Sequence, residues 1–145
     1  MIRRQRTSGG ACHRSMSRRG VVAPTILVAS LLAAACSGNL TVNTIQVGKS
    51  LNSDNSVAVL ATTFKRNDTI YASVLTDGTG RGTLSARFSY GGRVISEPEK
   101  RVSYKGSAAT EFHIEYSGGF PPGDYDIELF LNGMSVGMRR VRVEP

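Results

Sequence analysis

The sequence predicts an all-β protein, an immunoglobulin-like antiparallel β-sandwich of about seven to nine strands that follows an N-terminal signal peptide. Three observations predict this. Apolar and polar residues alternate in many short segments between residues 40 and 145. Gly, Asn, Asp and Pro separate these segments at intervals of roughly ten residues, as in sandwiches. The excess positive charge, by contrast, lies almost entirely in residues 1–35.

The uneven charge bears on the class of partner. Residues 1–35 contain six of the 18 Lys and Arg residues and none of the 11 Asp and Glu residues. The remaining 110 residues therefore carry a net charge of only +1. A nearly neutral domain does not need a polyanionic partner, so the sequence predicts no nucleic-acid binding.

The first segment has the order of a secretory signal peptide. A basic stretch ends at Arg18-Arg19, and the 15 residues of Val21–Ala35 are uncharged. A membrane-spanning helix needs about 20 apolar residues, which favours a cleaved signal over a permanent span. We predict that residues 1–35 are a signal peptide, with translation starting at Met1 or Met16. This segment fits export by the general secretory route and also export by the twin-arginine route.

The end of this segment is a row of small residues before a cysteine. Ala33-Ala34-Ala35-Cys36 resembles the lipobox of bacterial lipoproteins, although the commonest lipobox has Leu at the place of Ala33. The resemblance implies a diacylglyceryl group on the thiol of Cys36 and cleavage after Ala35. Residues 36–39 would then be a lipidated cysteine and a short tether. The expected location is extracytoplasmic, on the outer membrane if the organism has one and otherwise on the cell membrane.

Cys36 also has no candidate disulfide partner in the mature chain. The only other cysteine, Cys12, lies within the predicted signal peptide. A free thiol is uncommon in an oxidising compartment, and acylation removes it.

The first half of the domain, which begins at residue 40, is expected to supply three strands. In Leu40–Val47 we expect Leu40, Val42, Ile45 and Val47 to be buried, with an irregularity between the two pairs. Val57–Phe64 is predicted as an edge strand. Thr69–Thr76 alternates cleanly, so Ile70, Ala72 and Val74 are expected to face the core.

The clearest alternation lies in Thr83–Tyr90. Leu84, Ala86, Phe88 and Tyr90 fall on one face, and polar residues fall on the other. Gly91-Gly92 offers a two-residue hairpin turn, because glycine adopts positive φ without strain. Arg93–Ser96 is expected to run back as the partner strand.

The last three predicted strands are Glu111–Glu115, Asp124–Leu131 and Met134–Val143. Asn132-Gly133 is a strong hairpin signal between the second and the third. In Met134–Val143 the apolar residues change parity, which predicts a β-bulge near Arg139-Arg140. Before Asp124, the segment Pro121-Pro122-Gly123 resembles the immunoglobulin-like corner in which a Tyr hydroxyl, here that of Tyr125, bonds back to the main chain.

Three stretches resemble a small β-sandwich module found in secreted and lipid-anchored bacterial proteins. They are NDTIYASVLTDG (67–78), GTLSARFSYGGRVISE (82–97) and FPPGDYDIELFLNGMSVG (120–137). The resemblance implies the fold. It implies no activity and no binding residues.

Several constellations are poor catalytic or metal candidates. Residues 133–137 spell G-x-S-x-G, but the nucleophile elbow needs a following helix and a later His, and a strand is expected here. Residues 78–82 are Gly-rich but precede a strand, so we predict a hairpin loop and not a phosphate cradle. His113 shares a strand face with Glu111 and Glu115, which we interpret as a solvated row. We predict no catalytic residues, no bound metal and no cofactor.

The expected function is a non-enzymatic binding or accessory module that contacts another envelope protein. The alternative is capture of a small ligand or metal by the loops at the ends of the sandwich. Three loops are candidates: Lys49–Ser56, Asp77–Gly82 and Ser117–Gly123. Within them the candidate binding residues are Asp77, Gly78, Arg81 and Phe120.

Overall fold

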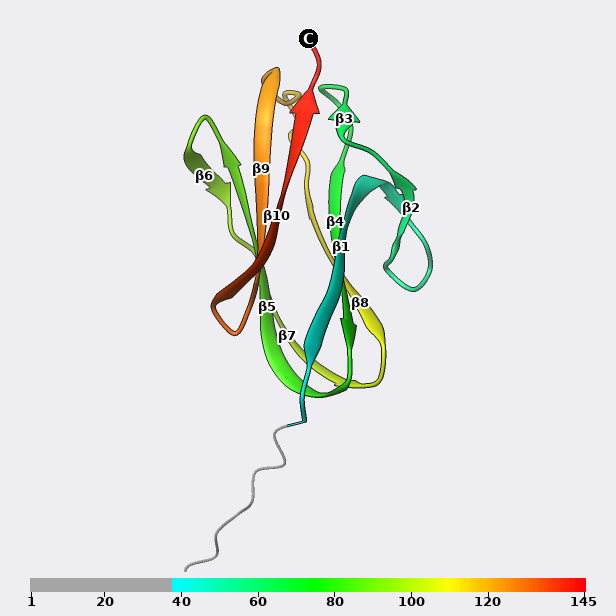
Figure 1. Ribbon diagram of the computed structural model, residues 1–145. Coiled ribbons are helices and arrows are strands. Elements are labelled where there is room, and N and C mark those ends of the chain that lie inside the picture. Colours follow the sequence, from blue (N-terminus) through cyan, green and yellow to red (C-terminus); the bar gives the residue numbers. More distant parts are fainter. Residues whose placement is uncertain (1–37) are drawn as a thin grey trace, which may run out of the picture. The chain divides into compact units, whose positions relative to one another are not determined.

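The computed structural model describes residues 38–145, which form ten β-strands (Figure 1). The strands are β1 (Thr41–Leu51), β2 (Val57–Leu60), β3 (Thr63–Phe64), β4 (Ile70–Asp77), β5 (Thr79–Tyr90), β6 (Arg93–Ser96), β7 (Glu99–Lys105), β8 (Ala108–Ile114), β9 (Gly123–Leu131) and β10 (Met134–Val143). The predicted signal peptide and Cys36, with its flanking Ala33, Ala34 and Ala35, lie outside the described residues. No helix in residues 38–145 is long and apolar enough to cross a membrane.

The strands form two sheets that pack face to face, as predicted. One sheet has the order β2-β1-β4-β8, and the other has the order β3-β10-β9-β5-β6, with β7 also paired to β5. The core between them comes from the alternate apolar residues of the long strands, which are almost fully buried. Its largest fully buried members are Phe64, Ile70, Leu84, Phe88, Phe112, Tyr125, Ile127 and Leu129. The immunoglobulin-like β-sandwich is therefore confirmed, because two antiparallel layers share one core.

Both predicted hairpin turns are present. Gly91 and Gly92 have φ of 56° and 77°, and Asn132 and Gly133 have φ of 52° and 79°. Two successive residues with positive φ define the type I′ turn, whose twist matches that of the flanking strands. Glycine and asparagine are the residues that adopt this geometry most readily.

The segment predicted as one edge strand, Val57–Phe64, is divided between the sheets. β2 pairs with β1 in the first sheet, whereas β3 pairs with β10 in the second sheet and runs parallel to it. The chain crosses at Ala61-Thr62, where Ala61 N–H donates to Val47 O (3.1 Å) and Arg142 N–H donates to Thr62 O (2.8 Å). One predicted strand thus supplies an edge to each sheet.

A strand that the sequence analysis did not predict, β7, continues the line of β6. β6 pairs with the end of β5 at residues 88–90, and β7 pairs with its first part at residues 79–85. Pro98, which has no N–H, interrupts the line, and its carbonyl accepts a hydrogen bond from Ala86 N–H (3.0 Å). The division of Val57–Phe64 and the additional strand β7 bring the number of strands to ten.

The β-bulge in β10 lies earlier than predicted. The register against β9 shifts between Ser135 and Gly137, not near Arg139-Arg140. Gly137 has φ of 152°, which a residue with a side chain rarely adopts, so glycine locates the irregularity directly after the hairpin. As a result Val141 and Val143 face the core, and Met138 is 52% exposed.

The two ends of the sandwich differ in what they carry. At the proximal end, where the described chain begins at Gly38, the chain crosses from β4 to β5 and from β7 to β8. At the distal end lie the end of β5, the start of β9 and the segment 115–122 between β8 and β9 (Figure 1). β5 runs from one end to the other, and its 12 residues span roughly 35 Å.

Candidate functional site

The predicted site residues do not come together. Asp77, Gly78 and Arg81 lie at the proximal end, whereas Phe120 lies at the distal end. The prediction of a hairpin loop at residues 78–82 is wrong. Asp77 is the last residue of β4, and residues 79–82 begin β5, where they pair with β7. The chain therefore bends from one sheet to the other at Gly78 alone.

Close main-chain contacts explain the glycines of this bend. A Cβ at Gly78 would lie 2.1 Å from Asn39 O, and one at Gly80 would lie 2.6 Å from Gly38 O. The Asp77 carboxylate accepts hydrogen bonds from Asn43 Nδ2 (3.0 Å) and from the Ser107 hydroxyl. These groups fix the start of the domain against the bend. Asp77 and Gly78 thus have a structural role here, and Arg81 is a strand residue opposite Ser103.

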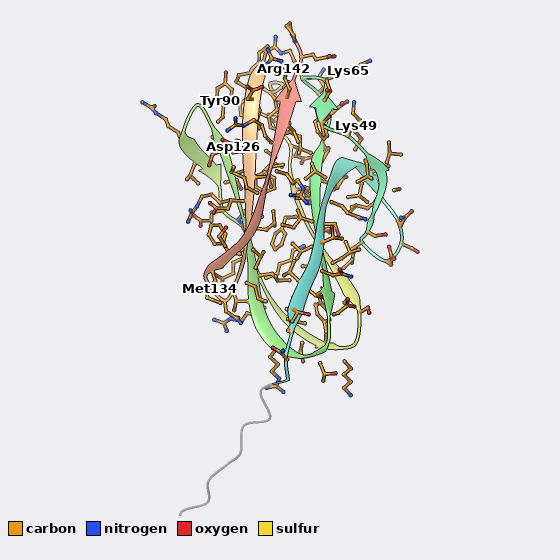
Figure 2. The ribbon with its side chains drawn as sticks, in the orientation of Figure 1. Lys49, Lys65, Tyr90, Asp126, Met134 and Arg142 are labelled. Carbon is orange, nitrogen blue, oxygen red and sulfur yellow. The ribbon has the colours of Figure 1, made fainter. Side chains whose placement is uncertain are left out.

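The distal end instead holds a cluster of four aromatic rings. The rings of Tyr90 and Tyr125 stack with their centroids 4.7 Å apart. Phe120 meets Tyr125 edge to face at 5.6 Å, and Tyr116 lies 6.3 Å from Phe120. Figure 2 shows Tyr90 at this end, which also carries Arg142 and Lys65. The cross-strand register places Tyr90 directly opposite Tyr125, so the sheet itself positions the central pair.

These rings line a cleft of about 500 Å³ between β6 and the end of β8. We call it the aromatic cleft; Tyr90, Ile95, Tyr116, Phe120 and Tyr125 form its apolar surface. Phe120 and Tyr125 are buried, whereas Tyr116 is 60% exposed and Ile95 is 48% exposed. A concave and mostly apolar space of this size is typical of small-ligand sites. Of the predicted binding residues, Phe120 alone belongs to it.

Two tyrosine hydroxyls hold the wall of the cleft in place. Tyr125 donates to the carbonyl of Pro121 (2.9 Å), as the predicted corner requires, and Tyr90 donates to the carbonyl of Pro122 (3.1 Å). Burial raises the pKa of the Tyr125 hydroxyl, and the neighbouring Tyr90 adds to this rise. A hydrogen-bond donor must be protonated, and the raised pKa keeps this hydroxyl protonated further into the alkaline range.

The segment between β8 and Pro121 is also fixed by its main chain. Gly119 N–H donates to Tyr116 O (2.8 Å) and closes a turn, and Phe120 N–H donates to Arg66 O (2.7 Å). Gly119 has φ of 76°, and a Cβ there would lie 2.9 Å from Asn67 Oδ1. Only glycine fits this position without a shift, which makes the turn a defined support for Tyr116 and Phe120.

His113 and Glu115 bring polar groups to the cleft. Nδ1 of His113 donates to Glu111 Oε2 (3.0 Å), and Lys100 Nζ contacts the other carboxylate oxygen of Glu111 at 2.7 Å. Burial raises the pKa of Glu111, but hydrogen bonds from Lys100 and His113 outweigh it and leave the pKa below its usual value. Glu111 thus pairs with Lys100. Within residues 38–145, no three His, Cys, Asp or Glu side chains are arranged so that they could hold a metal ion together.

Sequence reasoning found Phe120, but it missed Tyr90, Ile95 and Glu115 as lining residues. Tyr125 was given a folding role only. The signal that could have found the pair is the place of Tyr90 and Tyr125 at matching ends of two neighbouring strands. Tyr90 and Tyr125 meet only because of the register between β5 and β9, which the sequence pattern does not determine.

A second hollow, also of about 500 Å³, lies between the two sheets beside β10. Ile45, Val47, Leu60 and Arg139 are among its lining residues. Within the described chain, β3 pairs with only Arg142 and Val143 of β10, so the earlier part of this strand forms an open edge. Arg139 Nη1 donates to the main-chain carbonyl of Met138 (3.0 Å) and covers part of that edge.

Comparisons with known proteins support the fold alone. No protein-family model and no curated protein sequence matches the chain. Among solved structures, the chain is similar to an immunoglobulin-like protein from Pseudomonas aeruginosa, with a TM-score of 0.52 and 12% identity over 73% of this chain and 97% of that one. The CARDB domain of a Pyrococcus furiosus protein, solved with di-metal ions, gives a TM-score of 0.44 at 10% identity, over 74% of this chain and 90% of that one.

The chain also matches part of a β-glucosidase from Listeria innocua, with a TM-score of 0.46 and 7% identity. The match covers 75% of this chain but only 16% of the glucosidase. The similarity to the immunoglobulin-like protein agrees with the two-layer architecture described above.

Proposed function

We propose that this protein is a non-enzymatic binding module, held outside the cytoplasm by acyl chains on Cys36, with the aromatic cleft as its binding site. One observation carries the proposal: the described chain begins at the proximal end, and the cleft lies at the distal end. A lipid anchor a few residues before Gly38 would therefore leave the cleft accessible at the far side of the domain. Several acyl chains would make such an attachment long-lived.

The chemistry of the cleft favours binding over catalysis. Its histidine, His113, has Nδ1 hydrogen-bonded to Glu111, and within the described residues no hydrogen bond joins His113 to Ser96, the serine of the lining. The serine of the G-x-S-x-G motif, Ser135, lies on β10 next to a hairpin turn and donates to Glu128 Oε1 at 2.7 Å. A triad mechanism needs a serine within hydrogen-bonding reach of a histidine, and the hydroxyl of Ser135 bonds to a carboxylate instead.

A second candidate function is accessory contact with another envelope protein at the same end. Val94 and Ile95 on β6 are 53% and 48% exposed beside the cleft, and protein interfaces commonly include such apolar groups. The open edge of β10 is the weaker surface for a protein partner, because the Arg139 side chain occupies it.

The anchor is tested by mass spectrometry of the full protein expressed in a bacterial host. We expect an acylated N-terminus at residue 36 and recovery in the membrane fraction. Cys36→Ser should leave the protein without acyl groups and with the signal peptide uncleaved at Ala35. An unacylated residue 36, or an N-terminus elsewhere, would overturn the anchor.

The binding site is tested separately, by recovery of co-purified protein, metal and metabolites from detergent extracts. We expect Tyr116→Ala to lose what the wild type recovers. Met134→Ala is the matched control, since Met134 is 73% exposed on a different part of the surface (Figure 2). Equal recovery from wild type and Tyr116→Ala would remove the cleft from consideration.

A further inference from the structure

The polar groups of the aromatic cleft restrict the ligands that it can hold. The hydroxyls of Tyr90 and Tyr125 already donate to Pro122 and Pro121, so these residues offer ring surfaces and not free donors. A sugar or other polyol carries hydroxyls that lose hydrogen bonds to water on binding and need replacements. The polar side chains of the lining that could replace these bonds are few, namely those of Ser96, His113, Glu115 and Tyr116. The surface fits a ligand with an apolar body.

The charged side chains of the lining favour a cationic ligand. Glu115 is exposed and forms no ion pair with any residue in the described part of the chain. No Lys or Arg side chain is among the lining residues of this cleft. Aromatic rings carry a negative electrostatic potential on their faces, which attracts cations. The carboxylate and the rings therefore favour the same sign of charge on the ligand.

We propose that the aromatic cleft binds a small organic cation, an alkylated ammonium group whose apolar substituents contact Tyr116 and Phe120 and whose charge is balanced by Glu115. This inference rests on the proposed binding function and names the ligand class for its site. Aromatic walls with a nearby carboxylate suit such ions, because the ammonium charge is spread over methyl or methylene groups that need no hydrogen bonds.

Contacts within the chain fix the position of the Tyr116 ring. The turn from Tyr116 to Gly119 is closed by its own hydrogen bond, and a Cβ at Gly118 would lie 3.2 Å from Tyr116 Cε1. The Tyr116 ring thus lies against the turn even though 60% of the residue is exposed. A ring that is already positioned loses little conformational entropy on binding, which favours affinity for a small ligand.

The test compares two ligands of nearly the same shape that differ in charge. Choline and 3,3-dimethylbutan-1-ol are titrated separately into the full chain in a nonionic detergent, and aromatic ring shifts are followed by NMR. We expect choline to bind roughly tenfold more tightly than the neutral analogue and to shift ring signals of Tyr116 and Phe120. The chain has no Trp, so the aromatic spectrum is simple.

Matched variants separate the contributions of ring and charge. Tyr116→Phe should retain choline binding, whereas Tyr116→Leu, with similar apolar bulk but no ring, should weaken it about fivefold to tenfold. Glu115→Gln should weaken choline binding and leave the neutral analogue unaffected. Glu99→Gln, a change at an exposed carboxylate on β7 outside the cleft, is the control.

Equal or tighter binding of the neutral analogue, or no shift with choline, would overturn the cationic ligand class. Glucose is titrated as a third probe, and binding of glucose without choline would also overturn it. The proposed anchor is judged independently, because Cys36→Ser in the same detergent should bind choline as the wild type does. Failure of the ligand class is therefore distinguishable from failure of the anchor.

Discussion

Tyr90 and Tyr125 stack at 4.7 Å on neighbouring strands, and their hydroxyls hold the carbonyls of two consecutive prolines, Pro122 and Pro121. One pair of side chains thus stabilises both the end of the sheet and the segment that forms the cleft. The two hydroxyls are in different surroundings, since Tyr125 is 1% exposed and Tyr90 is partly exposed.

Removing the buried hydroxyl should destabilise the fold more than removing the exposed one. Tyr125→Phe leaves a carbonyl without its donor in a partly buried place, which should lower the free energy of unfolding by about 1–2 kcal/mol. Tyr90→Phe should cost roughly 0.5 kcal/mol, because water can replace the donor there. Urea unfolding of both variants measures the difference. Equal losses would mean that burial does not distinguish the two bonds.

Gly119 supports the cleft through a conformation that other residues disfavour. Gly119→Ala places a methyl group at φ of 76° and within 2.9 Å of Asn67 Oδ1, so we expect a loss of about 2 kcal/mol in unfolding free energy. Gly91→Ala is the control, since Gly91 also has positive φ but nothing within 4 Å of the added atom. It should cost only about 1 kcal/mol. A Gly119→Ala variant as stable as Gly91→Ala would show that the contact with Asn67 relaxes freely.

The strands that sequence alone predicted best have one face in the core and one in water. β9 is one example, because Tyr125, Ile127 and Leu129 alternate with polar residues. β7 escaped prediction because it lies at an edge, where its inner face is only half-buried and carries Lys100 beside Val102 and Tyr104. Alternation also cannot say to which sheet a strand belongs, so the division of Val57–Phe64 at Ala61 was not foreseen.

The site was less predictable than the fold for a physical reason. The Gly-rich composition of residues 78–82 predicts a hairpin loop, yet Gly78 and Gly80 serve the close approach of Asn39 and Gly38. The cleft forms from residues that are far apart in the sequence, such as Tyr90 and Phe120, and are brought together by strand register. Local patterns identify individual aromatic residues but not which of them meet.

Glu111 should make the stability of the protein depend on pH in the acidic range. Its pKa in the folded protein lies below its ordinary value of 4.5, so the carboxylate binds a proton more readily once the protein unfolds. The stability that the ionised Glu111 carboxylate contributes is complete above pH 4.5. It is lost as the pH falls through the lower pKa of the folded protein. We expect the unfolding free energy to fall less steeply between about pH 5 and 3 in Glu111→Gln than in the wild type.

The matched control for this experiment is Glu99→Gln on β7, the strand that precedes β8 in the chain. Lys100 lies next to Glu99 in the sequence but contacts Glu111, through both its carboxylate (2.7 Å) and its main-chain carbonyl (2.6 Å). Glu99→Gln should therefore retain the acid dependence of the wild type. An identical slope in the wild type and Glu111→Gln would contradict the role of the Lys100–Glu111 pair.

Arg139 should protect the open edge of β10 against association. The residue shares the inward-facing parity of Val141, yet it is exposed and its guanidinium covers the carbonyl of Met138. A charge at such a position prevents another strand from adding to the edge, and Met138 is an exposed apolar neighbour.

Arg139→Ile should leave the unfolding free energy within about 0.5 kcal/mol of the wild type but form concentration-dependent oligomers. Arg139→Lys, which keeps the charge, should behave in light scattering as the wild type does. If Arg139→Ile has the same molar mass as the wild type at all concentrations, the edge must be protected by the bulge at Val136 and by strand twist instead.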